Sequence, residues 1–401
     1  MNKIIDVGFN STEKILHVAD IHIRNYKRHK EYKQVFRKLY KEARKTPKET
    51  VIYVGGDIVH TKTDISPELI QMVSDFFNTL AKIRPTIVIT GNHDANLNNP
   101  SRLDSLSPIV DNLNNPNLHY LKDSGIYTIA GINYIVMSVF DDPKNYLTKK
   151  DLPKGYNIAL YHGPVNKSQT DIGYVVDNPH MTTKMFDGYD LVLLGDIHKK
   201  QFLNDEKTIC YVGSLIQQNF GETFENHGYM LWDVKTKKSE FFEIENDFGY
   251  YTIDVKDGKP LNLNRIPKKP RLRLRTENTT AADIKNIIVD IKKKYKIQDV
   301  TIIRQDNILS QKGDEITGIE ITRDVRSAEY QNQLLEDYLV RRFTLDEDMI
   351  SRIKVINSEL NKILNDIDIG RHIHWKPKKF EFSNMFSYGE GNTMDFENLS
   401  G

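Results

Sequence analysis

The chain has 401 residues, and its 56 Lys and Arg nearly balance its 55 Asp and Glu, leaving a formal charge of +1. This length predicts two or three domains, because one domain mostly holds roughly 100 to 200 residues. The near-neutral charge excludes a polyanion binder that works through the field of the whole molecule, so any such binding needs a local basic patch. With 39% hydrophobic residues, the chain is also not a disordered protein.

The single cysteine, Cys210, excludes an intrachain disulfide and a cysteine-cage zinc site. Any bound metal must therefore be held by His, Asp, Glu or Asn. No stretch approaches the roughly 20 apolar residues of a membrane span, and the first residues lack a signal core. We therefore expect a cytoplasmic protein without a membrane partner.

Five short aliphatic runs predict buried strands, and each run ends in a polar cluster. The runs are residues 15–18, 50–54, 85–90, 157–161 and 191–194. A helix is predicted over residues 67–83, with Ser66 as its cap and Pro67 in its first turn. Alternating strands and helices indicate an α/β layered domain, in which ligands collect beyond the carboxyl ends of the strands.

The pattern changes after about residue 245. Arg and Leu alternate over residues 271–275, a helical pattern covers 281–295, and 299–304 has the composition of a strand, which together predict a small β-α-β module. Two amphipathic helices are then predicted within residues 327–364, the second capped by residues 344–347. Periodicity alone leaves open whether they form a docking element or a hairpin packed on its own chain.

Each of the five predicted strands ends in nitrogen or oxygen donors, which we expect to meet at the same edge of one sheet. The donors are Asp20 and His22, then Asp57 and His60, then Asn92, His93 and Asp94, then His162, and finally Asp196 and His198. Carboxylates gathered in this way repel one another unless cations lie between them. The sequence therefore predicts a site for two metal ions.

Two divalent ions roughly 4 Å apart can polarise a phosphoryl group and lower the pKa of a water molecule. Imidazole, carboxylate and amide donors together suit Mn²⁺, Fe²⁺ or Zn²⁺ better than Mg²⁺. We therefore expect two divalent ions, which the donor chemistry allows to be Mn²⁺, Fe²⁺ or Zn²⁺.

The order of these motifs resembles the calcineurin-like metallophosphoesterases, and within them the SbcD-type DNA-repair nucleases that act with an SbcC-type ATPase. The resemblance extends over essentially the whole chain, including residues 211–215 and 227–229. It implies an α/β metallophosphoesterase sandwich over residues 1–245 and a small α+β capping domain over 246–322. A helical docking element would follow over 323–368, and a tail over 369–401.

The resemblance also assigns the metal ligands and favours Mn²⁺. One ion would take Asp20, His22, Asp57 and His198, and the other would take Asp57, Asn92, His162 and Asp196. Asp57 would bridge the two ions. His93 resembles the family's catalytic histidine, His60 the residue that steadies the phosphate, and Asp94 would orient His93. A histidine that titrates near pH 6.5 can supply a proton to the leaving sugar oxygen.

Asp196 departs from the family, which usually has histidine at this position. Two divalent ions with the carboxylates of Asp20, Asp57 and Asp196 leave a formal charge of +1, where a histidine would leave +2. Our hypothesis is that Asp196 retains metal more tightly and attracts the phosphate less strongly.

A basic stretch follows the first motif, with eleven Lys and Arg against two Glu between residues 21 and 48. Arg24, Lys27, Arg28 and Lys30 could contact DNA phosphates there, or they could belong to a solvated helix face. A second predicted DNA-contacting row consists of Arg271, Arg273 and Arg275, which share one strand face.

The tail, residues 379–389 and 394–401, resembles the opening two strands of the SbcC-type ATPase. An unrelated hairpin is the alternative. No phosphate-binding P-loop occurs in the sequence, so we expect no ATP hydrolysis by this chain alone. The resemblance implies a homodimer and an SbcC-type ATPase partner, supplied in trans or as a fused continuation.

These features predict a Mn²⁺-dependent DNA phosphodiesterase, an exonuclease or endonuclease subunit of an SbcCD-like complex that processes double-strand breaks. One alternative is another calcineurin-like phosphohydrolase, because fold alone does not identify the substrate. A second alternative is a catalytically weak tether for DNA ends, which only the change at Asp196 supports.

Overall fold

The structure, a computed structural model, describes residues 2–99, 101–304, 331–332, 335–336, 347–365, 378–383 and 390–395. The chain forms two compact units, residues 1–313 and residues 314–401. All of the predicted metal and catalytic residues belong to the first unit.

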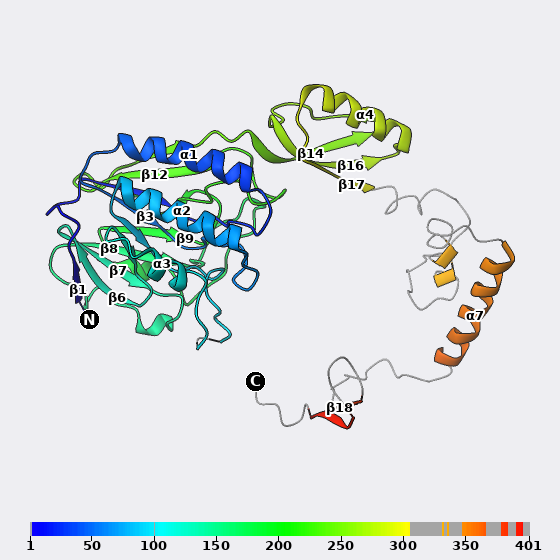
Figure 1. Cartoon of the computed structure of the whole chain (residues 1–401), viewed down its shortest axis with the longest axis horizontal. Coiled ribbons are helices and arrows are strands. Elements are labelled where there is room, and N and C mark those ends of the chain that lie inside the picture. The colour runs from blue at the N-terminus through cyan, green and yellow to red at the C-terminus, as the bar shows by residue number, and fades with distance from the viewer. Residues whose placement is uncertain are drawn as a thin grey trace. The chain divides into compact units, whose positions relative to one another are not determined.

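Two mixed β-sheets make up most of the first unit (Figure 1). The six-stranded sheet has the order β13-β12-β2-β3-β4-β5, with β2 (Lys14–Val18), β3 (Thr50–Val54), β4 (Thr86–Val88), β5 (Leu118–Tyr120), β12 (Gly228–Asp233) and β13 (Ser239–Glu243). The seven-stranded sheet has the order β1-β6-β7-β8-β9-β11-β10, with β1 (Asn2–Ile5), β6 (Gly125–Ile129), β7 (Ile132–Met137), β8 (Tyr156–His162), β9 (Leu191–Gly195), β10 (Gln201–Phe202) and β11 (Ile209–Tyr211).

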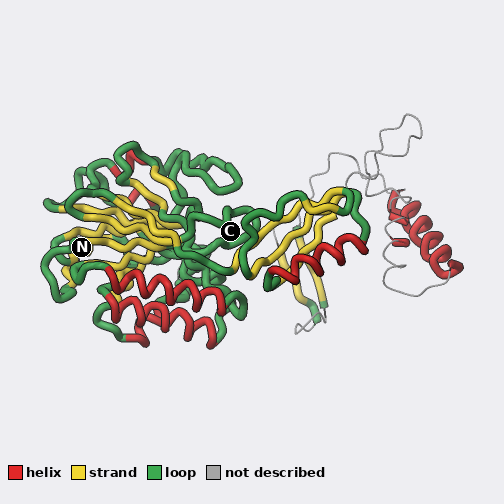
Figure 2. The backbone as a smooth tube through the Cα atoms, turned by 90° about the horizontal axis from the view of Figure 1, so that it is seen from above, coloured by secondary structure: helices red, strands yellow, loops and turns green. Residues whose placement is uncertain are grey.

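The two sheets pack face to face because strands β2 and β3 are apolar on both faces. Ile15 and Tyr53 point into a buried cluster shared with Leu160 of β8, while Leu16 and Ile52 point into a second cluster on the opposite face. The helices α1 (His29–Lys45), α2 (Pro67–Ile83) and α3 (Ser107–Leu113) cover that opposite face. Figure 2 shows the helices, in red, lying on one side of the layered strands. This is the predicted α/β sandwich.

The predicted helix over residues 67–83 matches α2, and its start is the predicted one. The Ser66 side chain accepts a hydrogen bond from Leu69 N at 3.3 Å, and Pro67 occupies the first turn. The outer face of the seven-stranded sheet carries the short helices η1 (Pro143–Asn145) and η2 (Thr183–Phe186), since Phe186 is buried in one cluster with Ala159 of β8 and Val192 of β9.

The five donor-bearing strands do not lie in one sheet, so this part of the sequence prediction is wrong. β2, β3 and β4 belong to the six-stranded sheet, whereas β8 and β9 belong to the seven-stranded sheet. Strands buried on both faces have the same apolar composition whichever sheet they join, so the sequence does not separate them. The donors still meet, because the carboxyl ends of the two parallel groups lie at the same rim of the sandwich.

A smaller sheet with one helix follows the sandwich, and we call it the capping sheet. Its order is β15-β14-β16-β17, with β14 (Phe248–Lys256), β15 (Lys259–Pro260), β16 (Lys269–Glu277) and β17 (Asp299–Arg304). Helix α4 (Ala281–Lys294) connects the parallel strands β16 and β17, so the β-α-β elements are as predicted. Leu272 and Leu274 are buried in the same cluster as Ile284 and Ile287 of α4.

The second unit contains α7 (Glu347–Asn365) and an antiparallel hairpin of β18 (Lys379–Phe382) and β19 (Asn392–Asp395). Met349, Ile356 and Leu360 of α7 are about half exposed. Most of the first predicted helix of the pair and the cap at residues 344–346 lie outside the described residues. The proposed domain boundaries and the docking role remain predictions. Among the residues that the structure describes, no helix has the length and apolarity needed to cross a membrane.

Candidate metal centre

The seven predicted metal ligands converge at the rim where the two sheets meet. Six of them lie in the loops that follow β2, β3, β4 and β9, while His162 is the last residue of β8. They are Asp20, His22, Asp57, Asn92, His162, Asp196 and His198. Asp20, His22, Asp57 and His162 are each no more than 2% exposed, so most of these donors are withdrawn from solvent.

Asp57 lies at the middle of the cluster. Its Oδ2 is 3.4 Å from His22 Nε2, and its Oδ1 is 3.3 Å from His162 Nε2. His22 Nε2 in turn lies 3.0 Å from His198 Nε2, and His162 Nε2 lies 3.9 Å from Asp196 Oδ1. One carboxylate oxygen therefore faces each half of the cluster, which is the arrangement that a bridging ligand requires.

Asp20 joins the two halves as well. Its ligand atoms lie within 4.8 Å of those of His22 and His198 on one side, and of those of Asp57 and His162 on the other. The backbone N–H of Asp196 donates to Asp20 Oδ1 at 3.0 Å, which fixes the carboxylate in the cluster. The groups of three donors are close enough to hold metal ions.

The backbone at four of the seven positions adopts a conformation that few side chains favour. Asp20, His22 and Asp57 have φ values of 52°, 49° and 53°, and Asp196 has 98°. Non-glycine residues with positive φ are uncommon, although Asp and His tolerate this region better than most. Such strain tends to gather at functional sites, where the surrounding structure holds it in place.

Two glycines allow the donor-bearing loops to approach each other closely, Gly91 within the six-stranded sheet and Gly195 between the two sheets. A Cβ atom on Gly91 would lie 2.2 Å from Asp57 N, and a Cβ atom on Gly195 would lie 2.2 Å from Gly55 O. Because these neighbours are backbone atoms, or a side chain in the cluster, they cannot move aside without displacing the donors. We conclude that the glycines in the motifs are needed for the close packing of the site.

The position of the Asn92 side chain is compatible with a divalent cation in this cluster. The side-chain oxygen of Asn92 lies 3.1 Å from His162 Nε2 and 3.1 and 3.2 Å from the two carboxylate oxygens of Asp57. With the amide turned the other way, its nitrogen would donate to the same three atoms. In the first orientation the amide oxygen faces Asp57 and His162, an arrangement that requires a cation among them or a proton on His162.

The protonation of the cluster is set mainly by burial and by mutual charge. Burial raises the pKa of Asp20 to about 7 and lowers the pKa of His22 well below its usual value. Burial alone would raise the pKa of Asp57, but the charge of His162 lowers it. Burial alone would lower the pKa of His198, but the hydrogen bond to Glu222 raises it to about 9. Metal binding must therefore release protons, and metal affinity should fall as the pH falls.

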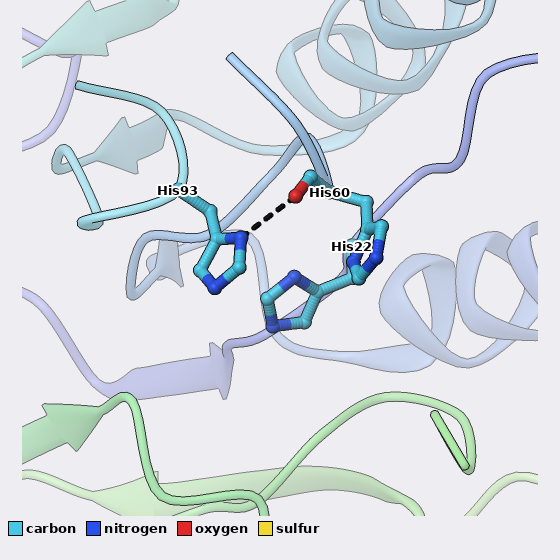
Figure 3. A group of neighbouring side chains, drawn as sticks. All are labelled: His22, His60 and His93. Carbon is cyan, nitrogen blue, oxygen red and sulfur yellow. Dashed lines mark hydrogen bonds between the residues drawn. The ribbon is translucent and has the colours of Figure 1, made fainter. Parts of the chain in front are cut away.

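His93 and His60 lie beside the cluster, together with His22 (Figure 3). His93 Nδ1 is 2.7 Å from the carbonyl oxygen of His60, and the backbone N–H of His93 donates to Asp57 Oδ1 at 2.8 Å. When Nδ1–H donates to that carbonyl, His93 Nε2 is the nitrogen that can reach a substrate. Burial, aided by Arg24, lowers the pKa of His60 to about 4, so His60 is neutral near pH 7.

Asp94 does not contact the His93 ring, in contrast to the sequence prediction. Its carboxylate accepts hydrogen bonds from the backbone N–H groups of Ile58, Val59 and Gly91, at 2.9, 3.0 and 3.0 Å. Asp94 therefore clamps the loops after β3 and β4 to each other, and the carbonyl group of His60 orients the His93 ring.

Two of the predicted DNA-contacting arginines are buried in an ion-pair cluster. Arg28 and Arg271 both bind the carboxylate of Glu31 at 2.9 Å, and the three side chains are only 3%, 13% and 0% exposed. The predicted DNA contacts by Arg28 and Arg271 are therefore wrong. The charges neutralise each other where α1 meets the capping sheet, a contact between distant segments that sequence spacing does not show.

The remaining predicted DNA-contacting residues differ in whether their charged groups already contact another part of the chain. Arg275 binds Asp254 through two hydrogen bonds of 2.6 and 2.9 Å, and Arg273 lies 4.0 Å over the ring of Phe220. Arg24 is half-buried and donates to the carbonyl oxygen of Gln218 at 3.2 Å. Lys27 and Lys30 are exposed, and their role in binding DNA stays a prediction.

Two partners of the metal-facing histidines were not predicted. His198 Nδ1 lies 2.8 Å from Glu222 Oε1, and His162 Nδ1 lies 2.7 Å from the carbonyl oxygen of Gly55. Glu222 lies in a loop outside every strand-end motif, so no sequence signal identifies it.

A cavity of about 310 Å³ opens beside Asp196 and His198, and the exposed side chain of Tyr174 contributes to its wall.

The layered sheets and this cluster agree with a metallophosphoesterase domain. Residues 13–200 match the family of calcineurin-like phosphoesterases, so the chain carries a calcineurin-like phosphoesterase domain. The His and Asp side chains at the sandwich rim are able to bind metal ions.

Curated relatives extend the comparison beyond that domain. "Uncharacterized protein R555" of Acanthamoeba polyphaga mimivirus is 39% identical over 418 residues, covering 99% of this chain and 30% of the relative. The protein 244L of Invertebrate iridescent virus 6, whose name includes the word phosphoesterase, is 26% identical over 262 residues, covering 62% of this chain and 80% of the relative. The SbcD component of the nuclease SbcCD from Staphylococcus saprophyticus is 26% identical over 255 residues, covering 56% of this chain and 66% of the relative.

Proposed function

We propose that this protein is a Mn²⁺-dependent DNA phosphodiesterase, an exonuclease or endonuclease subunit of an SbcCD-like complex that processes double-strand breaks. The observation that carries the proposal is the donor cluster centred on Asp57, which faces His22 at 3.4 Å and His162 at 3.3 Å. The likeness to the staphylococcal nuclease component supports DNA as the substrate.

Two divalent ions bound here would polarise the scissile phosphate and supply an activated water. The residues of the chain then have distinct tasks. Asp57 divides its two oxygens between the halves of the cluster, and Asp20 and Asp196 balance the cation charge. With His93 Nδ1 bound to the carbonyl oxygen of His60, Nε2 is the ring nitrogen that could pass a proton to the leaving oxygen, and neutral His60 could donate a hydrogen bond to the phosphate.

We further propose an SbcC-type ATPase as the partner, in trans or fused, and a homodimer as the working form. The alignment with R555 covers 99% of this chain, tail included, and leaves most of that relative unmatched. The hairpin of β18 and β19 is consistent with the two strands that the tail sequence predicts. Assembly can be tested by measuring the mass of the chain with and without the ATPase.

The test of the nuclease proposal compares linear duplex and single-stranded DNA with para-nitrophenyl phosphate, each with and without Mn²⁺. We expect Mn²⁺-dependent cleavage of DNA. Efficient hydrolysis of the small ester without DNA cleavage would favour another calcineurin-like phosphohydrolase. Binding of DNA ends without either reaction would favour the tether.

His93→Ala separates catalysis from binding. We expect a loss of cleavage of roughly 100-fold or more, because general acid-base catalysis contributes on the order of 10² to 10⁴, with unchanged Mn²⁺ and DNA binding. His180→Ala is the matched control, since His180 is an exposed histidine outside the cluster. Full activity of His93→Ala would contradict the catalytic role of His93.

A further inference from the structure

His198 has a buried acidic neighbour outside all of the motifs. Glu222 Oε1 lies 2.8 Å from His198 Nδ1, and the Glu222 side chain is only 6% exposed. When Nδ1–H donates to this carboxylate, the lone pair of Nε2 faces the cluster, where His22 Nε2 lies 3.0 Å away. The contact therefore selects the tautomer in which His198 can bind a metal ion.

Glu222 is itself held in place by its own loop. Its Oε2 accepts a hydrogen bond from Gln218 N at 2.7 Å, and its Oε1 accepts a second bond from Asn219 Nδ2 at 2.9 Å. The carbonyl oxygen of Glu222 accepts from Gln217 Nε2 at 2.9 Å. A carboxylate with several N–H donors has one preferred orientation, and it imposes that orientation on the His198 ring.

The same loop is tied to the capping sheet through Gln217. Gln217 Oε1 accepts from Tyr250 N of β14 at 2.7 Å, and Gln217 Nε2 donates to the carbonyl oxygen of Tyr250 at 3.1 Å. Arg28, paired with Glu31, also donates to the carbonyl oxygen of Gln217 at 2.6 Å. A continuous chain of hydrogen bonds therefore leads from the capping sheet to His198.

We propose that Glu222 is a positioning residue of the metal centre, and that Gln217 couples its position to the capping sheet. Glu222 holds His198 in the tautomer and orientation that bind the first of the two ions. This inference rests on the proposed function, because it requires His198 to be a metal ligand. The second half of the cluster has its own support, since the carbonyl group of Gly55 orients His162.

Mn²⁺ titration of the full chain without DNA tests the positioning role. We expect Glu222→Ala to weaken one of the two Mn²⁺ sites by roughly 10- to 100-fold, the usual effect of removing the partner of a metal-binding histidine, and to leave the other site unchanged. Glu222→Gln should restore most of the affinity, because its side-chain oxygen can still accept from His198 Nδ1. Glu225→Ala is the matched control: Glu225 lies in the same loop but forms an exposed ion pair with Arg265.

The tautomer of His198 provides a second measurement that needs no metal. In ¹H–¹⁵N spectra of the metal-free chain recorded above the His198 pKa of about 9, where the ring is neutral, we expect the proton on Nδ1 in the wild type and a mixture of tautomers in Glu222→Ala. Thermal unfolding of each variant shows whether the fold is kept. Gln217→Ala should weaken the same Mn²⁺ site by a smaller factor, several-fold.

The outcomes separate the two proposals. A folded Glu222→Ala variant that binds both Mn²⁺ ions as tightly as the wild type would overturn the positioning role. Unchanged Mn²⁺ affinity in Gln217→Ala would overturn the coupling to the capping sheet. A wild type that binds two Mn²⁺ ions, and loses one with Glu222→Ala, but does not cleave DNA, would support the positioning role and overturn the nuclease proposal.

Discussion

The metal centre and the arginine cluster on α1 are both dense groups of charged residues, but they differ in how far their charges are satisfied. Around Glu31, two guanidinium groups share one carboxylate at 2.9 Å, so each charge has an opposite charge beside it. Around Asp57, imidazole, carboxylate and amide acceptors face one another at 3.1 to 3.4 Å.

This difference distinguishes a binding site from a structural contact. A group whose charge is already paired has little left to offer a charged ligand, whereas converging acceptors require a proton or a cation. Five predictions follow, beginning with the largest expected effect.

Asp57→Asn should abolish the metal-dependent reaction. Asparagine keeps the shape and tolerates the left-handed backbone at this position, where φ is 53°, so the fold should persist. Removing a group that only orients a metal ligand lowers metal affinity or activity by about 10- to 100-fold. Asp57 is itself the proposed shared ligand, so its loss should reduce cleavage by more than 100-fold. Cleavage rate and Mn²⁺ stoichiometry are the measurements.

Asp257→Asn is the matched control, because Asp257 has a similar φ of 48° in the turn between β14 and β15. Asp257→Asn should leave both measurements unchanged. A fully active Asp57→Asn would show that Asp57 is not shared by two ions.

Glu31→Ala should affect folding stability. Removing the carboxylate leaves Arg28 and Arg271 buried without a countercharge, a change that typically destabilises by about 3 to 5 kcal/mol. Glu42→Ala is the control on the same helix: its half-buried carboxylate pairs with Lys45, and its loss should change the free energy of unfolding by less than about 1 kcal/mol. Equal effects in urea unfolding would contradict the buried ion-pair cluster.

The same residue gives a pH dependence with a defined sign. Burial alone would raise the pKa of Glu31, but the hydrogen bond and charge of Arg28, and then Arg271, lower it below 4.5. The folded chain thus binds this proton less tightly than the unfolded chain. The stabilisation by Glu31 should be full above about pH 4.5 and should disappear as the pH falls through the pKa of Glu31 in the folded chain. Glu31→Gln should remove this acid sensitivity, which unfolding experiments across this pH range would measure.

Asp196→His should shift the pH dependence of cleavage. The substitution raises the formal charge of the loaded site from +1 to +2, so half-maximal cleavage should move to lower pH by on the order of one unit, with weaker Mn²⁺ retention. Asp196→Asn separates charge from ligand type, because it removes the charge without adding an imidazole. Identical profiles for all three proteins would refute the charge hypothesis.

Lys27→Ala and Lys30→Ala should have the smallest effects. If these exposed lysines contact phosphates, each substitution should weaken DNA binding a few-fold and reduce the salt dependence by about one counterion. Arg275→Ala is the control, because Arg275 is already paired with Asp254. A salt dependence that stays the same in both lysine variants would favour a solvated helix face.

The sequence by itself determined much of the fold. The helix over residues 67–83 and the strand over 50–54 match α2 and β3, because an apolar face at regular spacing, a Ser cap and a Pro in the first turn all act locally. The identities of the seven donors were likewise readable at the strand ends. Within each sheet their convergence followed from chain direction, since parallel strands bring their carboxyl ends to one edge, whereas the packing of the two sheets brought the two groups of donors together.

Tertiary structure decided the rest. Which strands share a sheet, which arginines lose their charge to Glu31, and which group orients each histidine all depend on contacts between residues far apart in the chain, such as His198 and Glu222 or Arg271 and Glu31. A local pattern specifies that a polar residue is present. Only the packing of distant segments determines whether a partner is already in place or the residue remains able to bind a ligand.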